Sequence, residues 1–207
     1  MAYGMIIDLE KCVGCQACVV ACKESHGTPA GVYRSKVVRE TEGDYPNVVR
    51  TIVPMMCNQC ENPPCVDACP QEGATYKREE DGIVVVDAEK CIGCKLCAEA
   101  CPYEMRHLIE KEIPSYFEEG MTPYEDKMYA SFTPGTIDKC DFCLSRTEEG
   151  ETPQPACVQA CQAAARVFGD LDATKKQAAD RSGFQLLPEE GTEPAVYYQP
   201  LVAPKLD

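Results

Sequence analysis

The sequence predicts an α+β fold that consists of two small cysteine-rich modules related by internal duplication. Three observations support this prediction. The 16 cysteines of the 207-residue chain fall into four groups of four, with none left over. A shift of the chain by 79 residues places the first group on the third. Short apolar runs rich in β-branched residues precede both of these groups, as expected of strands that lead into ligand loops.

The third group is the most informative, because its motif is unbroken. Residues 91–102 read Cys-Ile-Gly-Cys-Lys-Leu-Cys-Ala-Glu-Ala-Cys-Pro. Three cysteines at CxxC spacing can ligate three irons of one [4Fe-4S] cube from a single tight loop, whereas the fourth lies too far along to reach that cube. In two-cluster ferredoxins this fourth cysteine ligates the other cluster. The motif therefore predicts ferredoxin-like two-cluster modules, with short strands, hairpins and helices around the clusters.

Two other uses of cysteine compete with this interpretation. Structural zinc sites also contain CxxC motifs, but they usually take two ligands from each of two loops, so a third cysteine at the same spacing has no place on the tetrahedron. Disulfide-rich domains are typically much shorter, and their cysteines do not recur in CxxC groups. The spacing therefore favours iron–sulfur clusters. The two histidines, His26 and His107, lack partners at metal spacing, and we expect them at the surface or beside the ligands.

Charge and composition limit the partners. The formal net charge is −14, and four oxidised cubes would bring the total to roughly −22. Such a chain is not expected to bind nucleic acid or anionic lipid through bulk charge. The hydrophobic fraction of 44% includes cysteine, so the organic core is thin. Cluster binding is then expected to supply folding free energy, and the apoprotein to be poorly folded.

The sequence also predicts a soluble subunit with no direct membrane insertion. No apolar run approaches the roughly 18 residues that span a bilayer. The start of the chain lacks a signal-peptide core and a twin-arginine pair. We expect the subunit to work either in the cytoplasm or, after co-export with a catalytic partner that carries the signal, on the extracytoplasmic face of the cell membrane.

Residues outside the ligands support the duplication. Asp-Leu-Glu-Lys-Cys-Val-Gly-Cys at 8–15 overlies Asp-Ala-Glu-Lys-Cys-Ile-Gly-Cys at 87–94. Met5–Ile7 corresponds to Val84–Val86, and both runs are predicted strands. The second and fourth groups also correspond, because Cys-Val-Asp-Ala-Cys in the second resembles Cys-Val-Gln-Ala-Cys in the fourth. This similarity indicates a repeat rather than two chance motifs.

A few further elements are predicted between the groups. A strand is expected at 48–54, and a hairpin at 76–86 that turns at Asp81-Gly82. A short polar helix is expected after Asp172 to about Ala179, followed by a strand at 195–199. Residues 113–136 form an acidic, proline-interrupted insert loop that contains several aromatic residues. This loop would either face another protein or pack on its own domain.

The four CxxC-based groups, with a compressed second group and a long loop in the fourth, resemble a known family. They are similar to the four-cluster electron-transfer (beta) subunit of the DMSO reductase family of molybdopterin oxidoreductases, which includes polysulfide, arsenate, thiosulfate and DMSO reductases. The resemblance runs from about Tyr3 to Leu171, and residues 187–198 are similar to the ends of such subunits in arsenate and polysulfide reductases. Nitrate reductase-type relatives replace one ligand, whereas every position here is cysteine, which implies four [4Fe-4S] clusters. The usual proline after the fourth cysteine is absent at Lys23 and Gln162.

The pairing of the groups follows from the crossed fourth ligand. The linker at 70–90 is 21 residues long, against 34 and 38 for the other two, and the shorter loop favours groups two and three as one module. This preference is only about half a kcal/mol, and the resemblance implies the same pairing. The expected domains are an outer module of residues 1–50 plus 137–171, an inserted module at 51–112, the insert loop at 113–136 and a C-terminal tail at 172–207. The expected ligand sets are Cys12, Cys15, Cys18 and Cys161; Cys22, Cys140, Cys143 and Cys157; Cys57, Cys60, Cys65 and Cys101; and Cys69, Cys91, Cys94 and Cys97.

The expected function is electron transfer in anaerobic metabolism. The resemblance implies a relay of single electrons between a molybdopterin (Mo or W) catalytic subunit, which alone would hold the molybdopterin cofactor, and a quinone-linked or soluble redox partner. A quinol-oxidising membrane anchor subunit is a further partner that the resemblance allows. No acid–base pair or activated nucleophile stands out, so the chain is not expected to be an enzyme on its own. A free polyferredoxin and a zinc-stabilised interaction module are the alternatives.

Overall fold

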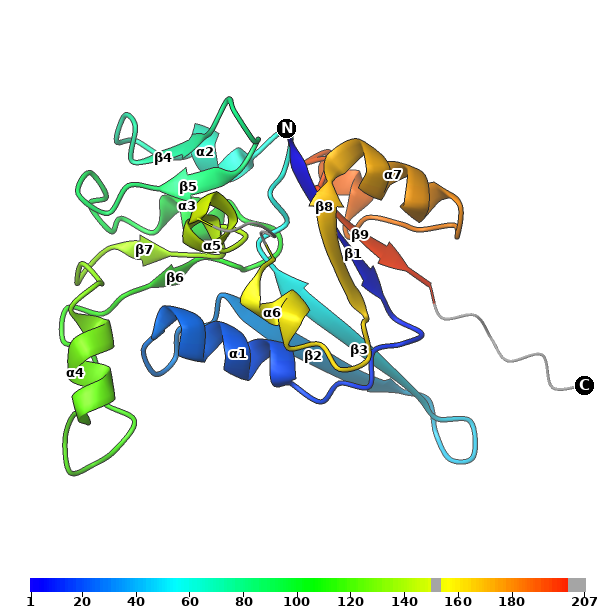
Figure 1. The fold of residues 1–207 in the computed structure, drawn as a ribbon, viewed down its shortest axis with the longest axis horizontal. Coiled ribbons are helices and arrows are strands. Elements are labelled where there is room, and N and C mark those ends of the chain that lie inside the picture. Colours follow the sequence, from blue (N-terminus) through cyan, green and yellow to red (C-terminus); the bar gives the residue numbers. More distant parts are fainter. Residues whose placement is uncertain (150–153, 201–207) are drawn as a thin grey trace, which may run out of the picture.

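A three-stranded sheet joins the two ends of the chain in the computed structural model, which describes residues 1–149 and 154–200. Its central strand, β1 (Tyr3–Asp8), pairs antiparallel with β8 (Arg166–Asp170) and parallel with β9 (Val196–Gln199). Helix α7 (Leu171–Ala179) packs against β1 (Figure 1). The apolar run at Met5–Ile7 is fully buried in this sheet, which confirms the strand predicted there.

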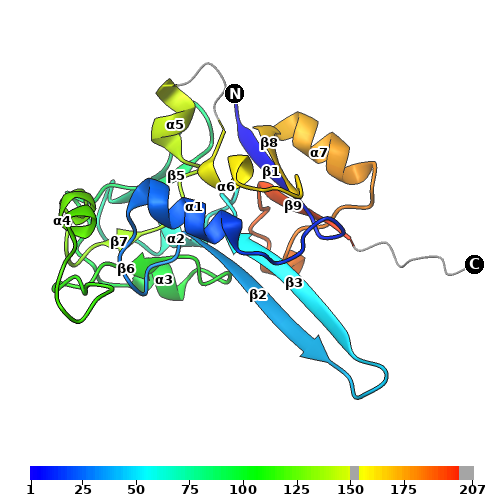
Figure 2. The same cartoon turned by 60° about the horizontal axis from the view of Figure 1, so that its bottom comes forward.

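The remaining strands form three antiparallel ladders. The longest ladder extends from the body of the protein as an arm (Figure 2). The predicted hairpin is confirmed, since β4 and β5 pair across a loop that contains Gly82. The strand expected at 48–54 is β3, whereas its partner β2 was not predicted. The ladders join β2 (Ser35–Glu42) to β3 (Val49–Met56), β4 (Thr75–Lys77) to β5 (Val84–Val86), and β6 (His107–Leu108) to β7 (Ile137–Asp138).

The helices are short, and most of them belong to the cysteine groups. One helix in each group contains the third cysteine of that group. These are α1 (Ala17–His26), α2 (Pro64–Asp67), α3 (Leu96–Glu99) and α6 (Ala156–Gln159). Helix α1 packs on α6 and α2 packs on α3, so the groups meet in pairs. Helix α5 (Leu144–Glu149) follows the second cysteine of the fourth group. None of the helices in the described part of the chain has the length and apolar character to cross a membrane.

The hydrophobic core is divided and includes the cysteines. The largest part lies between the sheet and the fourth group, where Phe142 packs edge-on against Phe168. Two smaller parts surround Val84 and Tyr103. Each of the three parts contains buried cysteines, so the packing of the apolar side chains depends on what those cysteines bind.

The insert at 113–136 differs from the predicted loop, because it contains α4 (Pro123–Tyr129). Thr122 and Glu125 form a capping box at the start of this helix. The insert packs on its own chain: the Tyr116 hydroxyl donates to the Thr28 carbonyl at 3.3 Å, and the Tyr124 hydroxyl donates to the Glu24 carbonyl at 2.7 Å. Of the two alternatives for the insert, these contacts support packing on its own domain.

Residues 172–200 are an integral part of the fold rather than a peripheral tail. The predicted helix and strand are confirmed as α7 and β9. The C-terminal segment, residues 184–199, also reaches across the molecule. The Ala195 amide donates to the Asn58 carbonyl at 2.9 Å, and the Tyr198 hydroxyl donates to the Pro54 carbonyl at 3.0 Å. This segment therefore fastens the sheet to the loop that carries the second cysteine group.

Candidate metal centres

The structure brings the cysteines together in four sets of four. Each of three of the sets lines a small cavity. In the remaining set, burial and the charges of Cys22, Cys143 and Cys157 together raise the pKa of Cys140. Each set takes three cysteines from one group and the fourth from another. In the order used below, set A is Cys12, Cys15, Cys18 and Cys161; set B is Cys22, Cys140, Cys143 and Cys157; set C is Cys57, Cys60, Cys65 and Cys101; set D is Cys69, Cys91, Cys94 and Cys97.

The turns before sets A and D have the same hydrogen bonds. Asp8 Oδ1 accepts from the amides of the residues two and three positions later, at 3.1 and 3.3 Å. Asp87 Oδ1 does the same at 3.0 and 3.4 Å. Each carboxylate also pairs with the following lysine, Lys11 at 3.7 Å and Lys90 at 3.2 Å. The Asp and Lys shared by the two motifs therefore fold the backbone that presents the first cysteine.

The glycine between the first two cysteines of these motifs has a left-handed backbone. Both Gly14 and Gly93 have φ of 66°. A Cβ atom on Gly93 would lie 2.0 Å from the carbonyl oxygen of Gly135, which belongs to the loop that leads into β7. At Gly14 the nearest atoms belong to the Ile52 side chain, at 3.1 Å. The ligand loop of set D therefore packs against the backbone of Gly135, whereas that of set A packs against the side chain of Ile52.

The chemistry of the thiols fits iron. Burial, together with the charges of neighbouring cysteines, raises the pKa of Cys22 and Cys60 to about 12 and that of Cys143 to about 11. Such thiols become thiolates at neutral pH only where cations compensate the charge. Among the described residues, no three His, Cys, Asp or Glu side chains are grouped to hold one metal ion. Four thiols spread around a cavity instead fit a cube with an iron at each ligated corner.

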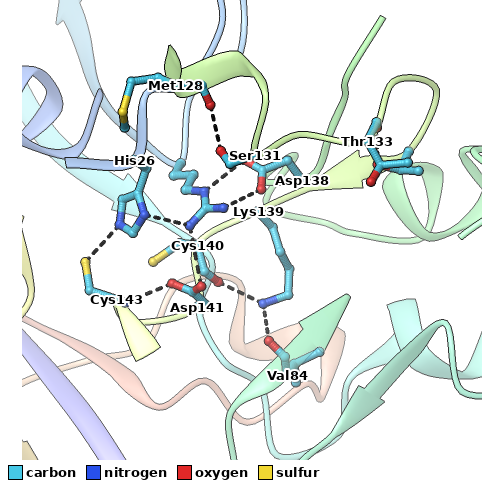
Figure 3. Close-up of polar contacts among 12 residues, drawn as sticks. His26, Val84, Met128, Ser131, Thr133, Asp138, Lys139, Cys140, Asp141 and Cys143 are labelled. Atoms are coloured by element: carbon cyan, nitrogen blue, oxygen red, sulfur yellow. Dashed lines mark hydrogen bonds and ion pairs between the residues drawn. The ribbon is translucent and has the colours of Figure 1, made fainter. Parts of the chain in front are cut away.

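A histidine and an arginine stand beside set B (Figure 3). The Nε2 atom of His26 lies 3.1 Å from Cys143 Sγ, and its Nδ1 atom lies 3.0 Å from Arg34 Nη1. Arg34 is held by Asp138 at 2.6 Å. Because a guanidinium only donates, Nδ1 is the acceptor, and Nε2 carries the hydrogen that points at the sulfur. His26 is therefore beside a ligand, one of the two positions expected for it. Burial, followed by the charge of Arg34, lowers the pKa of His26.

Sequence reasoning missed three buried cations near the cysteines: Arg106, Lys139 and Arg166. Arg106 Nη2 donates to Cys65 Sγ at 3.0 Å. Arg166 lines the cavity of set A. Lys139 donates to the carbonyl of its neighbour Cys140 at 2.8 Å. A signal was present, because each arginine is the fifth residue after the fourth cysteine of its group, Cys101 or Cys161.

Comparisons with known proteins identify the family. The family model for a 4Fe-4S dicluster domain matches residues 48–115 and 115–171, and that for a 4Fe-4S binding domain matches residues 3–24. The arsenate respiratory reductase iron-sulfur subunit ArrB of Shewanella sp. (strain ANA-3) is 35% identical, with 96% of each chain covered. One subunit of the tetrathionate reductase of Salmonella typhimurium is 38% identical, over 95% of this chain and 71% of the relative. One subunit of the selenate reductase of Mesobacillus selenatarsenatis is also 38% identical, over 94% and 70%.

These matches confirm the iron–sulfur interpretation. Two dicluster domains and 16 cysteines provide for four [4Fe-4S] clusters. Relatives from Halobacterium salinarum and Shewanella sp. are named as iron–sulfur subunits of a dimethyl sulfoxide reductase and an arsenate respiratory reductase. The chain belongs to the family of [4Fe-4S] electron-transfer subunits of the molybdopterin oxidoreductases.

Proposed function

We propose that each of the four sets holds one cube and that the cubes form a single row in the order A, B, C, D. The support comes from which sets face one another. The charge of Cys18 in set A acts on Cys157 in set B. Gln59 of the set C loop donates to the Cys140 carbonyl of set B at 2.8 Å. The charges of both set C and set D act on Arg106.

The row implies two modules, one of which is inserted in the sequence between the two segments of the other. Sets C and D lie within residues 51–112, and sets A and B are built from residues 1–50 and 137–171. The pairing of α1 with α6 and of α2 with α3 supports this division. The matching turns at Asp8 and Asp87 support an origin by duplication. The C-terminal segment then links the two modules, since it contacts both Pro54 and the outer sheet.

The two ends of the row are open to partners. Cys15 of set A and Cys94 of set D are the exposed cysteines of the chain, and most of those in sets B and C are buried. An apolar side chain follows the first cysteine at each end: Val13 is 69% exposed and Ile92 is 62% exposed. Exposed apolar side chains beside a redox centre are typical of a docking surface. One end would face the molybdopterin catalytic subunit, and the other a quinone-linked or soluble partner.

The clusters supply one-electron chemistry when they are bound. The residues of this chain hold them at fixed positions, keep water from the two middle sets and balance their negative charge. The relatives named for tetrathionate and arsenate reductases indicate respiratory complexes. A membrane anchor subunit that oxidises quinol is consistent with this role, and the complex would work in the cytoplasm or, after co-export with the catalytic subunit, outside it.

Charge substitutions at the two ends test the proposal. Val13→Asp and Ile92→Asp place a carboxylate beside set A and set D respectively. Val167→Asp, on an equally apolar residue of β8 that is 42% exposed, is the control. We expect all three proteins to keep about 16 irons per chain, as for four cubes. Val13→Asp and Ile92→Asp should each lose co-purification or electron transfer with one partner, and with a different one.

Three results would contradict the proposal. Loss of the same partner with both end variants would show that the row does not run between two partners. An equal loss with the β8 control would show that added charge alone is responsible. A well-occupied native protein with about 12 irons or fewer, or with zinc, would remove the four-cube assignment itself.

A further inference from the structure

Three buried cations occupy the three junctions of the proposed row. Arg106, Lys139 and Arg166 are between 3% and 5% exposed. None of them forms an ion pair with a carboxylate in residues 1–149 and 154–200. A buried cation is strongly unfavourable unless an opposite charge compensates it. The nearest groups that can carry negative charge are the cysteine sulfurs, so the cations and the cluster sites depend on one another.

Arg106 stands between sets C and D. Its Nη2 atom donates to Cys65 Sγ of set C at 3.0 Å, and its Nη1 atom donates to Thr75 Oγ1 at 3.0 Å. Thr75 lines the cavity of set D, where burial raises the pKa of Cys97 and the charge of Arg106 opposes this increase. The fork of donors on one arginine thus reaches a ligand of set C and a residue that lines set D.

Arg166 occupies the corresponding place between sets A and B. The guanidinium lines the cavity of set A, and the charge of Cys157 in set B acts on it. Its Nη1 atom donates to Met56 Sδ at 3.5 Å. Ser35 Oγ accepts from its Nη2 atom at 3.2 Å and holds the group in place, as Thr75 does for Arg106. Burial raises the pKa of Cys12 in set A, and the charge of Arg166 opposes this increase. Each arginine therefore lies five residues after the fourth cysteine of its group and faces two of the sets.

Lys139 occupies the remaining junction, between sets B and C. Its ammonium donates to the carbonyls of Cys140 and of Val84, as Figure 3 shows. Cys140 is a member of set B, and Val84 lines the cavity of set C. Burial raises the pKa of Cys65 in set C, and Arg106 and Lys139 lower it. The lysine thus connects the inner and the outer module.

We propose that Arg106 and Arg166 are positioning residues, each of which bridges the two cubes of one module and stabilises an added electron on either of them. Lys139 has the same role across the junction between the modules. Each reduction adds negative charge inside the protein, where the repulsion between neighbouring cubes is weakly screened. A cation between two cubes offsets this repulsion and raises both reduction potentials. The inference rests on the proposed sets, because it requires each arginine to face two cubes.

Redox potentiometry of the loaded protein, monitored by EPR, tests this inference. Arg106→Gln should lower the reduction potentials of two clusters, and Arg166→Gln should lower those of the other two. Lys139→Gln should lower one potential from each pair. Lys176→Gln removes an exposed cation from α7 and should shift none of them. This complementary pattern needs no prior assignment of signals to sets, and a role in folding alone would not produce it.

Other patterns would overturn the inference. A glutamine variant that shifts one potential alone, shifts all four equally or shifts none would show that the arginine does not bridge a pair. If a glutamine variant loses iron, its potentials cannot be compared with those of the native protein. The variants Arg106→Lys and Arg166→Lys then test the bridge, because they keep the positive charge. A lysine ammonium is a point charge that cannot lie close to both sets at once. The two potentials of that pair should therefore move apart, and unchanged potentials would refute the bridge. Native protein without four clusters would instead refute the proposed function.

Discussion

Gly93→Ala is expected to cost much more stability than Gly14→Ala, although the two glycines occupy equivalent positions and share φ of 66°. The left-handed backbone alone costs an alanine roughly 1–2 kcal/mol at either position. At Gly14 the new methyl group would meet Ile52 side-chain atoms at 3.1 Å, and a small movement of that side chain relieves the contact. The additional cost at this position is therefore small.

At Gly93 the new methyl group would meet backbone. The Gly135 carbonyl oxygen lies 2.0 Å from the position of the added Cβ, so residues 135–136 must move. Two hydrogen bonds of 2.8 Å hold those residues, from the Gly135 amide to the Ile109 carbonyl and from the Ile109 amide to the Thr136 carbonyl. Loss of both adds about 2 kcal/mol, which brings the total for Gly93→Ala to about 3–4 kcal/mol.

The movement should also release the cube of set D. The Ile137 amide, next to the displaced residues, donates to Cys91 Sγ at 3.4 Å. Proteins with bound clusters do not unfold in two states, so the suitable assay is the iron retained per chain after anaerobic gel filtration in increasing urea. Gly14→Ala should keep about 16 irons and Gly93→Ala about 12. Equal iron loss in the two variants, or greater loss from Gly14→Ala, would refute the reasoning.

Substitutions at three further places give separate tests. Cys161→Ser should alter the EPR signal of the cube in set A, and Cys22→Ser that of set B, whereas a change of one common signal would contradict the sets. The pKa of Glu125 is lowered to about 2 by the amides of Thr122 and Tyr116, below its ordinary 4.5. Its contribution to α4 is therefore present above about pH 4.5 and lost as the pH falls towards 2, and Glu125→Gln should remove this pH dependence of amide hydrogen exchange in the insert. Tyr198→Phe should lower the urea concentration at which iron is released, because the Pro54 carbonyl loses its donor, whereas Tyr197→Phe, on the opposite face of β9, should leave that concentration unchanged.

Local patterns explain what the sequence could predict. The cysteine spacing, the strand before each ligand loop and the Asp81-Gly82 hairpin all depend on neighbouring residues, and the strands and the hairpin are present in the structure. The iron–sulfur chemistry is local in the same sense, because three ligands of a cube come from one loop. The family comparisons confirm this chemistry.

The features that were missed depend on distant residues or on weak signals. Strand β2 reads Ser-Lys-Val-Val-Arg-Glu-Thr-Glu, and only its pairing with β3 reveals it as a strand. Helix α4 is seven residues long, but the Thr122-Pro-Tyr-Glu125 capping box could have indicated its start. The buried cations carried no local signal of burial. Only a shared spacing, an arginine five residues after Cys101 and after Cys161, could have identified the two arginines, and Lys139 had no such signal.

The closure of the sheet by the last strands of the chain has a consequence for biosynthesis. Strand β1 leaves the ribosome first, yet its partners β8 and β9 are among the last residues to be made. The apolar Met5–Ile7 run therefore waits without a sheet partner during most of translation. All eight cysteines of sets C and D, in contrast, are available once residue 101 has emerged. In the proposed arrangement the inner pair of cubes can be inserted into a nascent chain, whereas the outer pair must wait for Cys140 to Cys161, so a chain cut short before Cys140 would keep at most half of its iron.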